Sequence, residues 1–253
     1  MLEKKKAGCR EKDGREGELT AFGRFYVRFA DRWLPVYAAI PIISCFVWNV
    51  IVYYLTGKLM AGAKHYDLTT AFDRMVPFIP QWVFIYLGCF LFWAVNYILS
   101  GREGRESCCR FVAADLLSRT ICAVFLILLP TTNVRPDITG NTLADNLMRF
   151  VYGIDEPVNL FPSIHCLVSW MSFLGIRKSR KVPAWYKVFS CVFAILVMAS
   201  TQFTKQHYIV DVISGVAVAQ LCMALSCRRD LYRRIEKPFR WIERKVFGVY
   251  RDE

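Results

Sequence analysis

Residues 34–56 read LPVYAAIPIISCFVWNVIVYYLT, a run of 23 residues without a charged side chain. An α-helix rises ~1.5 Å per residue, so this run spans about 35 Å, which exceeds the ~30 Å hydrocarbon core of a bilayer. A soluble helix of that length would carry charges along one face, and this run carries none. The stretch therefore predicts a membrane-spanning helix, and it sets the fold class for the rest of the chain.

Similar apolar stretches recur along the chain. Of its 253 residues, 55% are hydrophobic and 21% are charged, and the charges gather between the apolar stretches. This pattern predicts an all-α integral membrane protein with six transmembrane helices. The fourth stretch is short, about 23 Å as a helix, so we expect it to begin below the membrane surface. The predicted spans are 34–56, 81–100, 111–130, 162–176, 184–203 and 208–227.

The distribution of Lys and Arg predicts the orientation. With the N-terminus inside, the inner segments carry 25 of these residues and the outer segments six. Positive residues accumulate on the cytoplasmic side, so both termini are predicted to lie in the cytoplasm. The chain then divides into a basic segment 1–33, a membrane domain 34–227 and a basic tail 228–253. The net charge is +12, and the Lys and Arg residues that produce it gather at the inner ends of the spans. We therefore expect membrane lipids as partners and no nucleic acid.

The segments outside the spans carry weaker patterns. Basic and apolar residues alternate in 1–33 and 228–253, which favours helices lying on the inner leaflet. An interfacial helix is expected within 57–80. The longest connection, 131–161, contains an amphipathic helix that is placed to cover a site. The predicted apolar face of that helix consists of Leu143, Leu147, Phe150 and Val151.

His207 and Asp211 are candidates for catalysis. Their spacing of four residues places them on one face of a helix. A carboxylate in that position can hold one imidazole nitrogen and leave the other free to attack or to pass a proton. The pair alone is weak evidence, because a histidine in an apolar context is more often a packing residue.

Two other polar motifs fall at the outer ends of predicted spans. Pro162 and Ser163 precede His165 at the start of the fourth span, and Arg135 follows the third. We expect Pro162 in the first turn of a helix, whose free N–H groups, together with the Ser163 hydroxyl, form an anion site. Arg135 offers paired donors suited to phosphate oxygens. The ten cysteines show no metal-ligand spacing and no disulfide pattern, and we interpret them as packing residues. The anion site, the two histidines and the arginine together predict phosphoryl transfer without a metal.

The three motifs, in this six-span arrangement, resemble the type-2 phosphatidic acid phosphatase superfamily of lipid phosphatases and phosphotransferases. The resemblance covers roughly residues 73–227. The matching positions are Arg135-Pro136, then Pro162-Ser163-Ile164-His165, then Ser200 followed by His207 and Asp211.

The resemblance implies a role for each matched residue. His207 would be the nucleophile that takes the phosphoryl group, and Asp211 would orient it. His165 would protonate the leaving alkoxide. Arg135 and Ser163 would hold the phosphate. The resemblance implies no metal and no other cofactor, a fold that is a six-helix bundle, and an active site at the outer membrane face.

The chain departs from the family pattern at three positions. Leu128 stands where the family has a lysine, Thr201 where it has an arginine, and Ile164 where it has a glycine. Lys205, two residues before the expected nucleophile, is a candidate replacement for one of the missing cations. The bulky third residue and the lack of an arginine after the motif serine are more similar to the branch that contains inositol phosphorylceramide synthases and sphingomyelin synthases.

Three functions remain open at this point. The first is hydrolysis of a lipid phosphate or diphosphate through a phosphohistidine. The second is transfer of a phosphate-linked head group to a lipid alcohol, which needs a second lipid site that excludes water. The third is lipid binding or transport without catalysis, which the missing cations favour and the retained histidines oppose.

Two further polar positions lie outside these motifs. Arg119 lies inside the third span, four residues after Asp115. The two can pair with each other, or the arginine can contact a lipid head group or a polar channel. The remaining histidine, His65, is expected to take no part in catalysis.

Overall fold

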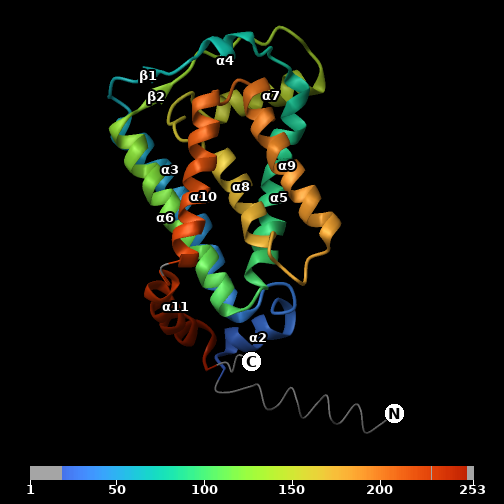
Figure 1. Cartoon of the computed structure of the whole chain (residues 1–253), viewed down its shortest axis with the longest axis vertical. Helices are drawn as coiled ribbons and strands as arrows, with labels where there is room; N and C mark the ends of the chain where they lie inside the picture. Colours follow the sequence, from blue (N-terminus) through green and yellow to red (C-terminus); the bar gives the residue numbers. More distant parts are fainter. Residues whose placement is uncertain (1–18, 229, 250–253) are drawn as a thin grey trace.

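The computed structural model describes residues 19–228 and 230–249 (Figure 1). In this part of the chain, five helices are long and apolar enough to cross a membrane, and the protein is an integral membrane protein. The part of the predicted basic segment before residue 19 lies outside the described residues. The five helices are α3 (Val36–Met60), α5 (Val83–Gly101, preceded by the short helix η1, Pro80–Trp82), α6 (Arg105–Leu128), α9 (Ala184–Phe203) and α10 (Ile209–Arg228).

The predicted span 184–203 coincides with α9, and the ends of α5 and α10 differ from prediction by one or two residues. α3 continues four residues beyond the predicted end at 56, and α6 begins at Arg105 instead of 111 and ends at Leu128 instead of 130. The early start of α6 has a physical reason, because the charges in its first turns are paired. The Arg110 guanidinium bonds to the Glu106 carboxylate, one turn earlier.

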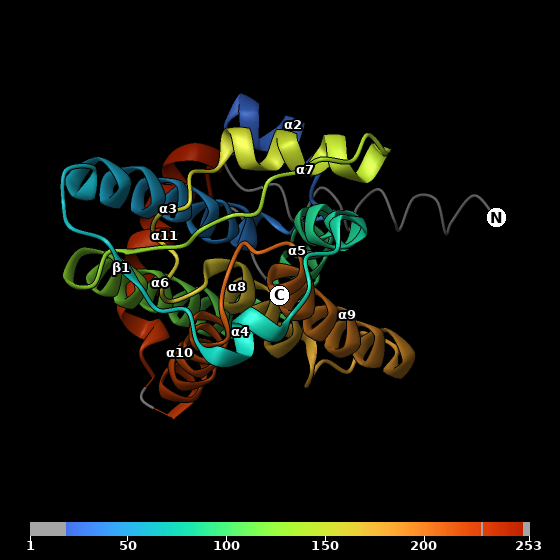
Figure 2. The same ribbon diagram turned by 90° about the horizontal axis from the view of Figure 1, so that it is seen from above.

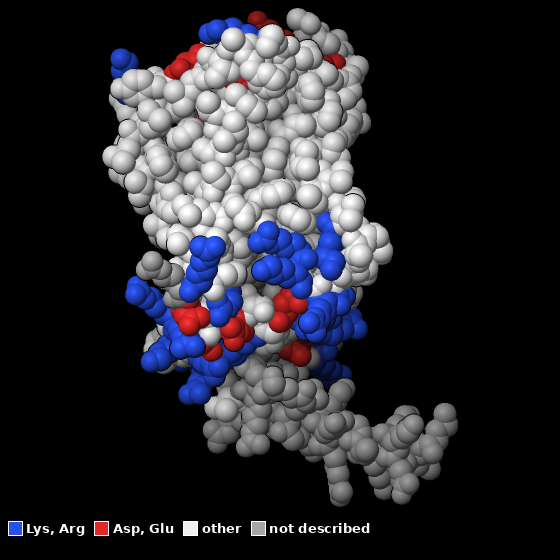
Figure 3. All heavy atoms as spheres, in the orientation of Figure 1, with Lys and Arg blue, Asp and Glu red and all other residues white. Residues whose placement is uncertain are grey.

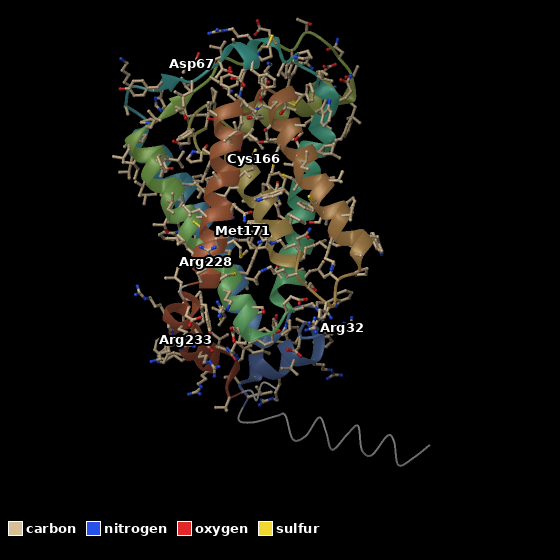
Figure 4. All side chains as sticks on the ribbon, viewed as in Figure 1. Arg32, Asp67, Cys166, Met171, Arg228 and Arg233 are labelled. Carbon is tan, nitrogen blue, oxygen red and sulfur yellow. The ribbon has the colours of Figure 1, made fainter. Side chains whose placement is uncertain are left out.

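The short fourth stretch forms α8 (Ile164–Ile176), which lies in the middle of the bundle. Its thirteen residues span about 20 Å, and none of them is exposed. It packs against α5, α9 and α10, which surround it when the molecule is seen from above (Figure 2). Cys166 and Met171 of α8 point into this interior (Figure 4). Because protein surrounds α8, its length need not match the membrane.

The main apolar core lies between α8 and the long helices around it, and large apolar side chains also cover the outside of the bundle. Figure 3 shows an uncharged band across the middle of the face in view, with most of the visible Lys and Arg at one end. That end carries α2 (Ala21–Phe29) and α11 (Tyr232–Phe247), and we call it the α11 end. The opposite end carries α4 (Ala71–Met75) and α7 (Leu143–Ile154), and we call it the α7 end.

At the α7 end, β1 (Tyr66–Asp67) pairs in parallel with β2 (Thr131–Thr132). The helix expected within 57–80 is only α4, five residues long. It begins with a capping box between Thr70 and Asp73 and stops before Pro77, because a residue preceding proline disfavours helical backbone.

The amphipathic helix predicted within 131–161 is confirmed as α7. Its buried face differs from the prediction: Val151 is buried and Leu147 packs against the core, whereas Leu143 and Phe150 are exposed. Ala144 and Met148 are buried instead, against Val83 and Tyr86 of α5. The predicted and the buried apolar residues form two neighbouring stripes along α7, and contact with α5 determines which stripe is buried.

At the α11 end, the first and last described segments pack on each other. Leu19 forms a β-bridge with Gly248, and the added Cβ of an alanine at Gly23 would lie 2.0 Å from the carbonyl oxygen of Phe247. The helix predicted in the basic tail is confirmed as α11, and Glu243 in it receives two hydrogen bonds from Arg105 at the start of α6. The chain therefore enters and leaves the bundle at one end.

Candidate functional site

His207 lies in the short connection between α9 and α10, and Asp211 lies in the first turn of α10. The distance from His207 Nδ1 to Asp211 Oδ2 is 3.6 Å. The same carboxylate oxygen accepts a hydrogen bond from the backbone N–H of Tyr208 at 2.8 Å, which holds it at the helix start. Nδ1 of His207 is buried and has no other partner among the described residues. The carboxylate thus faces Nδ1, and Nε2 points away from it.

His165, the second residue of α8, faces this free nitrogen. Its Nδ1 lies 3.4 Å from Nε2 of His207. Its Nε2 forms a 2.9 Å hydrogen bond with the hydroxyl of Tyr86, whose ring also stacks on the imidazole at 4.8 Å between centroids. Tyr86 therefore holds His165 by a hydrogen bond on the side away from His207, and the Asp211 carboxylate faces the far nitrogen of His207 at 3.6 Å. The two predicted histidines meet through nitrogens that have no other hydrogen-bond partner within residues 19–228 and 230–249.

The start of α8 is tied to the first turn of α10. Ser163 is the N-cap of α8, and its hydroxyl accepts from the N–H of Cys166 at 3.2 Å. Its own N–H donates to the carbonyl oxygen of Asp211 at 3.1 Å. Pro162 therefore precedes the helix instead of occupying its first turn. Ser163 is fully buried, so its hydroxyl shapes the helix start.

Arg135 approaches the site from the connection after β2. One of its terminal nitrogens donates to Oε1 of Gln206 at 2.7 Å, and its guanidinium lies 4.6 Å from the ring centre of Tyr152. The other terminal nitrogen bonds to the carbonyl oxygen of Asp155, and the Asp155 carboxylate lies 3.7 Å from the nitrogen that bonds Gln206. Nε of Arg135 and Nε2 of Gln206 are buried without a partner among the described residues. Arg135 therefore contacts Gln206, the residue that precedes His207 in the chain.

The structure does not bring the Lys205 ammonium to the histidines. Lys205 has a left-handed backbone (φ 54°), and its Nζ donates to the carbonyl oxygens of Asp73 and Val76 at 2.8 and 2.5 Å. Burial lowers the pKa of this lysine. Asp73 also caps α10, because its carboxylate accepts from the N–H of Ile209 at 2.8 Å. Lys205 therefore anchors α4 over the start of α10.

Leu128 and Thr201, which stand where the family has a lysine and an arginine, provide no positive charge at the site. Leu128 is 73% exposed on the outside of α6. Thr201 is buried, and its hydroxyl donates to the carbonyl oxygen of Met198 in its own helix. Neither position supplies a cation, so any anion bound here relies on Arg135 and on uncharged donors.

His165 and His207 open into a cavity of about 270 Å³, which we call the histidine cavity. Aromatic and aliphatic side chains form most of its wall, and Ile164, which replaces the motif glycine, is one of them. The polar groups on the wall come from different helices and loops. They are Asn49, Tyr53, Tyr86, Asp155, Asn159, His165, Gln206 and His207.

Several of these polar residues were not predicted from the sequence. Tyr86 and Asn49 lie in uncharged spans, where nothing in the pattern distinguishes the inner face from the lipid face. Gln206 had a usable signal, because it directly precedes His207. Of the two alternatives for Arg119, the pairing with Asp115 is confirmed, since its guanidinium lies 3.2 Å from the Asp115 carboxylate inside the bundle.

Comparison with known proteins identifies the family. A search of curated proteins and a search of solved structures found no match. A family profile described as the PAP2 superfamily matches residues 65–225, which include both histidines, Asp211, Arg135 and Ser163. This match covers more than half of the chain and every site residue predicted from the sequence. The chain belongs to the PAP2 superfamily.

Proposed function

We propose that this protein hydrolyses a lipid phosphate or diphosphate through a phosphohistidine intermediate on His207. The observation that carries the proposal is the pairing of the two imidazoles: His207 Nε2 and His165 Nδ1 face each other at 3.4 Å, and each ring is held from behind by another side chain. One nucleophile and one proton donor, both oriented, are what phosphoester cleavage requires.

In the first step, Nε2 of His207 attacks phosphorus, and the bond from phosphorus to the lipid oxygen breaks. His165, hydrogen-bonded to Tyr86 through Nε2, delivers a proton from Nδ1 to the leaving alkoxide. Asp211 stabilises the positive charge that develops on His207. In the second step, water attacks the phosphohistidine, His165 takes a proton from that water, and phosphate leaves with His207 restored.

The phosphate oxygens need donors during both steps. Gln206 offers a buried amide N–H pair beside His207, and Arg135 behind it supplies the positive charge. The N-terminus of α8 adds its helix dipole, with Ser163 holding the first turn in place. This set is weaker in charge than the family pattern with its additional lysine and arginine.

The same proposal places the site outside the cytoplasm. The α11 end carries the basic connections and tails, so it faces the cytoplasm with both termini, and α8 counts as the sixth span inside the bundle. The α7 end and the histidine cavity then face outward. The hydrocarbon chains of a lipid reach the cavity from the bilayer beside Phe90, which lines the cavity and is 53% exposed on α5.

A second cavity favours transfer as the alternative function. Its volume is about 380 Å³, and Lys58, His65 and Glu156 are among the residues that line it. It shares part of its wall with the histidine cavity. The shared residues are Tyr53, Ile154, Val158 and Asn159. An acceptor alcohol held there would lie next to a phosphohistidine. This arrangement, with the replaced motif residues, suits the branch of inositol phosphorylceramide and sphingomyelin synthases.

The test is a panel of lipid phosphates and phospholipids incubated with the purified full-length protein in nanodiscs, with and without added lipid alcohols, and analysed by mass. Free phosphate that depends on His207 supports hydrolysis, and a new phospholipid without free phosphate supports transfer. Equal turnover by wild type and His207→Ala would overturn both. Lipid binding without turnover would identify a non-catalytic protein. Ser44→Ala, which alters α3 away from the cavity, is the matched control.

A further inference from the structure

The side-chain amide of Asn49 faces the histidine cavity from the middle of α3. Its oxygen accepts a hydrogen bond from a terminal nitrogen of Arg119. A guanidinium only donates, so the amide atom that faces Arg119 is the oxygen, and the NH₂ group points away from it. That NH₂ group has no hydrogen-bond partner among the residues that the structure describes.

Arg119 is itself held on several sides. Its second terminal nitrogen bonds to the Asp115 carboxylate and to the Tyr97 hydroxyl, each at 3.2 Å. The Tyr97 hydroxyl in turn donates to the same carboxylate oxygen at 2.5 Å. Arg119 is 2% exposed and Asp115 is fully buried. A network through α5 and α6 therefore fixes the direction of an amide on α3.

The arrangement repeats at Gln206. There too an arginine, Arg135, holds the amide oxygen of a residue that lines the cavity, and the NH₂ group is buried without a partner among the described residues. Two arginines thus fix the amides of two residues that line one cavity. A donor at an apolar wall costs free energy unless a ligand accepts from it.

The two donors lie at different depths. Gln206 belongs to the connection at the α7 end, next to His207. Asn49 lies eleven residues before the end of α3 at Met60, about 16 Å along the helix. Apolar residues such as Trp93, Leu160 and Ile164 line the cavity as well. A lipid with its phosphate at His207 would place its linker, the part between phosphate and chains, toward Asn49.

We propose that Asn49 Nδ2 donates a hydrogen bond to a carbonyl oxygen in the linker of the lipid substrate, with Arg119 as its positioning residue. The proposal rests on the proposed phosphoester cleavage and names its substrate class. Lipids with an ester or amide carbonyl near the phosphate, such as diacylglycerol phosphate or ceramide phosphate, fit this donor. Polyprenyl phosphates, which lack a carbonyl, do not use it.

The test compares two substrates in the same nanodiscs, diacylglycerol phosphate and a polyprenyl phosphate. Asn49→Asp retains an oxygen for Arg119 and removes the NH₂ donor. We expect the ratio of kcat/KM for the diacyl over the polyprenyl substrate to fall about tenfold, the effect of one lost hydrogen bond. Any repulsion between the new carboxylate and phosphate acts on both substrates and cancels in the ratio. Ser44→Ala, five residues earlier on the same helix, should leave the ratio unchanged.

The outcomes separate this inference from the proposed function. If wild type cleaves both lipids and Asn49→Asp leaves the ratio unchanged, the assignment of Asn49 is overturned and the proposed cleavage stands. If wild type cleaves neither lipid, the proposed cleavage and this assignment both fall. Asn49→Ala, smaller and without a side-chain donor, is the second variant if the aspartate variant does not fold, and the same fall in the ratio is expected.

Discussion

The N–H of Ser163 donates to the carbonyl oxygen of Asp211 at 3.1 Å, so the start of α8 and the first turn of α10 form one unit. His165 follows two residues after the donor, and His207 precedes the acceptor by four. The distance between the two imidazoles therefore depends on a contact between backbones. Substitutions that disturb this contact should separate the histidines without altering either one.

Gly215→Ala tests this contact. The added Cβ would lie 2.5 Å from the carbonyl oxygen of Ser163 and 3.3 Å from the backbone nitrogen of Leu167, so α8 must move away. We expect a loss of about 1–3 kcal/mol in stability, reduced by the better helix propensity of alanine, together with a fall in turnover. Thermal unfolding in detergent and phosphate release measure the two effects.

The control is Gly153→Ala in α7, where an added Cβ has no heavy atom within 4 Å. That variant should unfold at the wild-type temperature or slightly above it. Wild-type stability and turnover in Gly215→Ala would contradict the proposed dependence on this contact.

Tyr86→Phe tests the orientation of His165. The ring stack remains, while the 2.9 Å hydrogen bond to Nε2 is lost. We expect kcat to fall about five- to tenfold, the effect of ~1 kcal/mol in the transition state, with KM little changed. Steady-state kinetics in nanodiscs provide the measurement. Tyr54→Phe, on an exposed tyrosine of α3, should behave as wild type, and an unchanged kcat in Tyr86→Phe would rule out the orienting role.

Lys205 and Arg135 should give opposite results when replaced. Lys205→Met loses two hydrogen bonds to backbone carbonyls and should lower stability by about 1–3 kcal/mol with KM for the lipid phosphate nearly unchanged. Arg135→Gln removes the charge behind Gln206 and should reduce kcat/KM about tenfold to a hundredfold. Unfolding temperature and kcat/KM, measured on both variants, distinguish the roles. A large rise in KM in Lys205→Met would restore that lysine as a phosphate ligand.

The ion pair inside the bundle gives a double-mutant prediction. Arg119→Met leaves the Asp115 carboxylate buried without its partner and should cost about 3–5 kcal/mol. Adding Asp115→Asn removes the uncompensated charge and should recover a large part of that loss. Thermal unfolding of the single and double variants in detergent tests the coupling. Equal unfolding temperatures for the two would show that the pair contributes little.

The spans were predictable because uncharged runs of about twenty residues have few alternatives to a membrane helix. Their ends were less so. The basic residues at 102–110 indicated a connection, yet the helix α6 already begins at Arg105. The ion pair between Arg110 and Glu106 stabilises its charged first turns. In α7 the sequence carried two apolar stripes, and only contact with α5 decides which one is buried.

The histidines of the candidate site came together as predicted, because each motif lies at the same end of its span. The residues that hold them could not be predicted the same way. Tyr86 and Asn49 are single polar groups in apolar helices, whose rotation depends on packing. Lys205 is two residues from His207, but a left-handed backbone turns its side chain toward α4.

The enclosed position of α8 has a consequence for how the protein is made. A helix of thirteen residues that touches other helices on all sides offers the bilayer too little apolar length to stay in it alone. We therefore expect α8 to leave the translocon only when α9 and α10 have been synthesised and can accompany it. The histidines would then be assembled late in biogenesis, and truncated chains that end before α9 should fail to integrate their last segment.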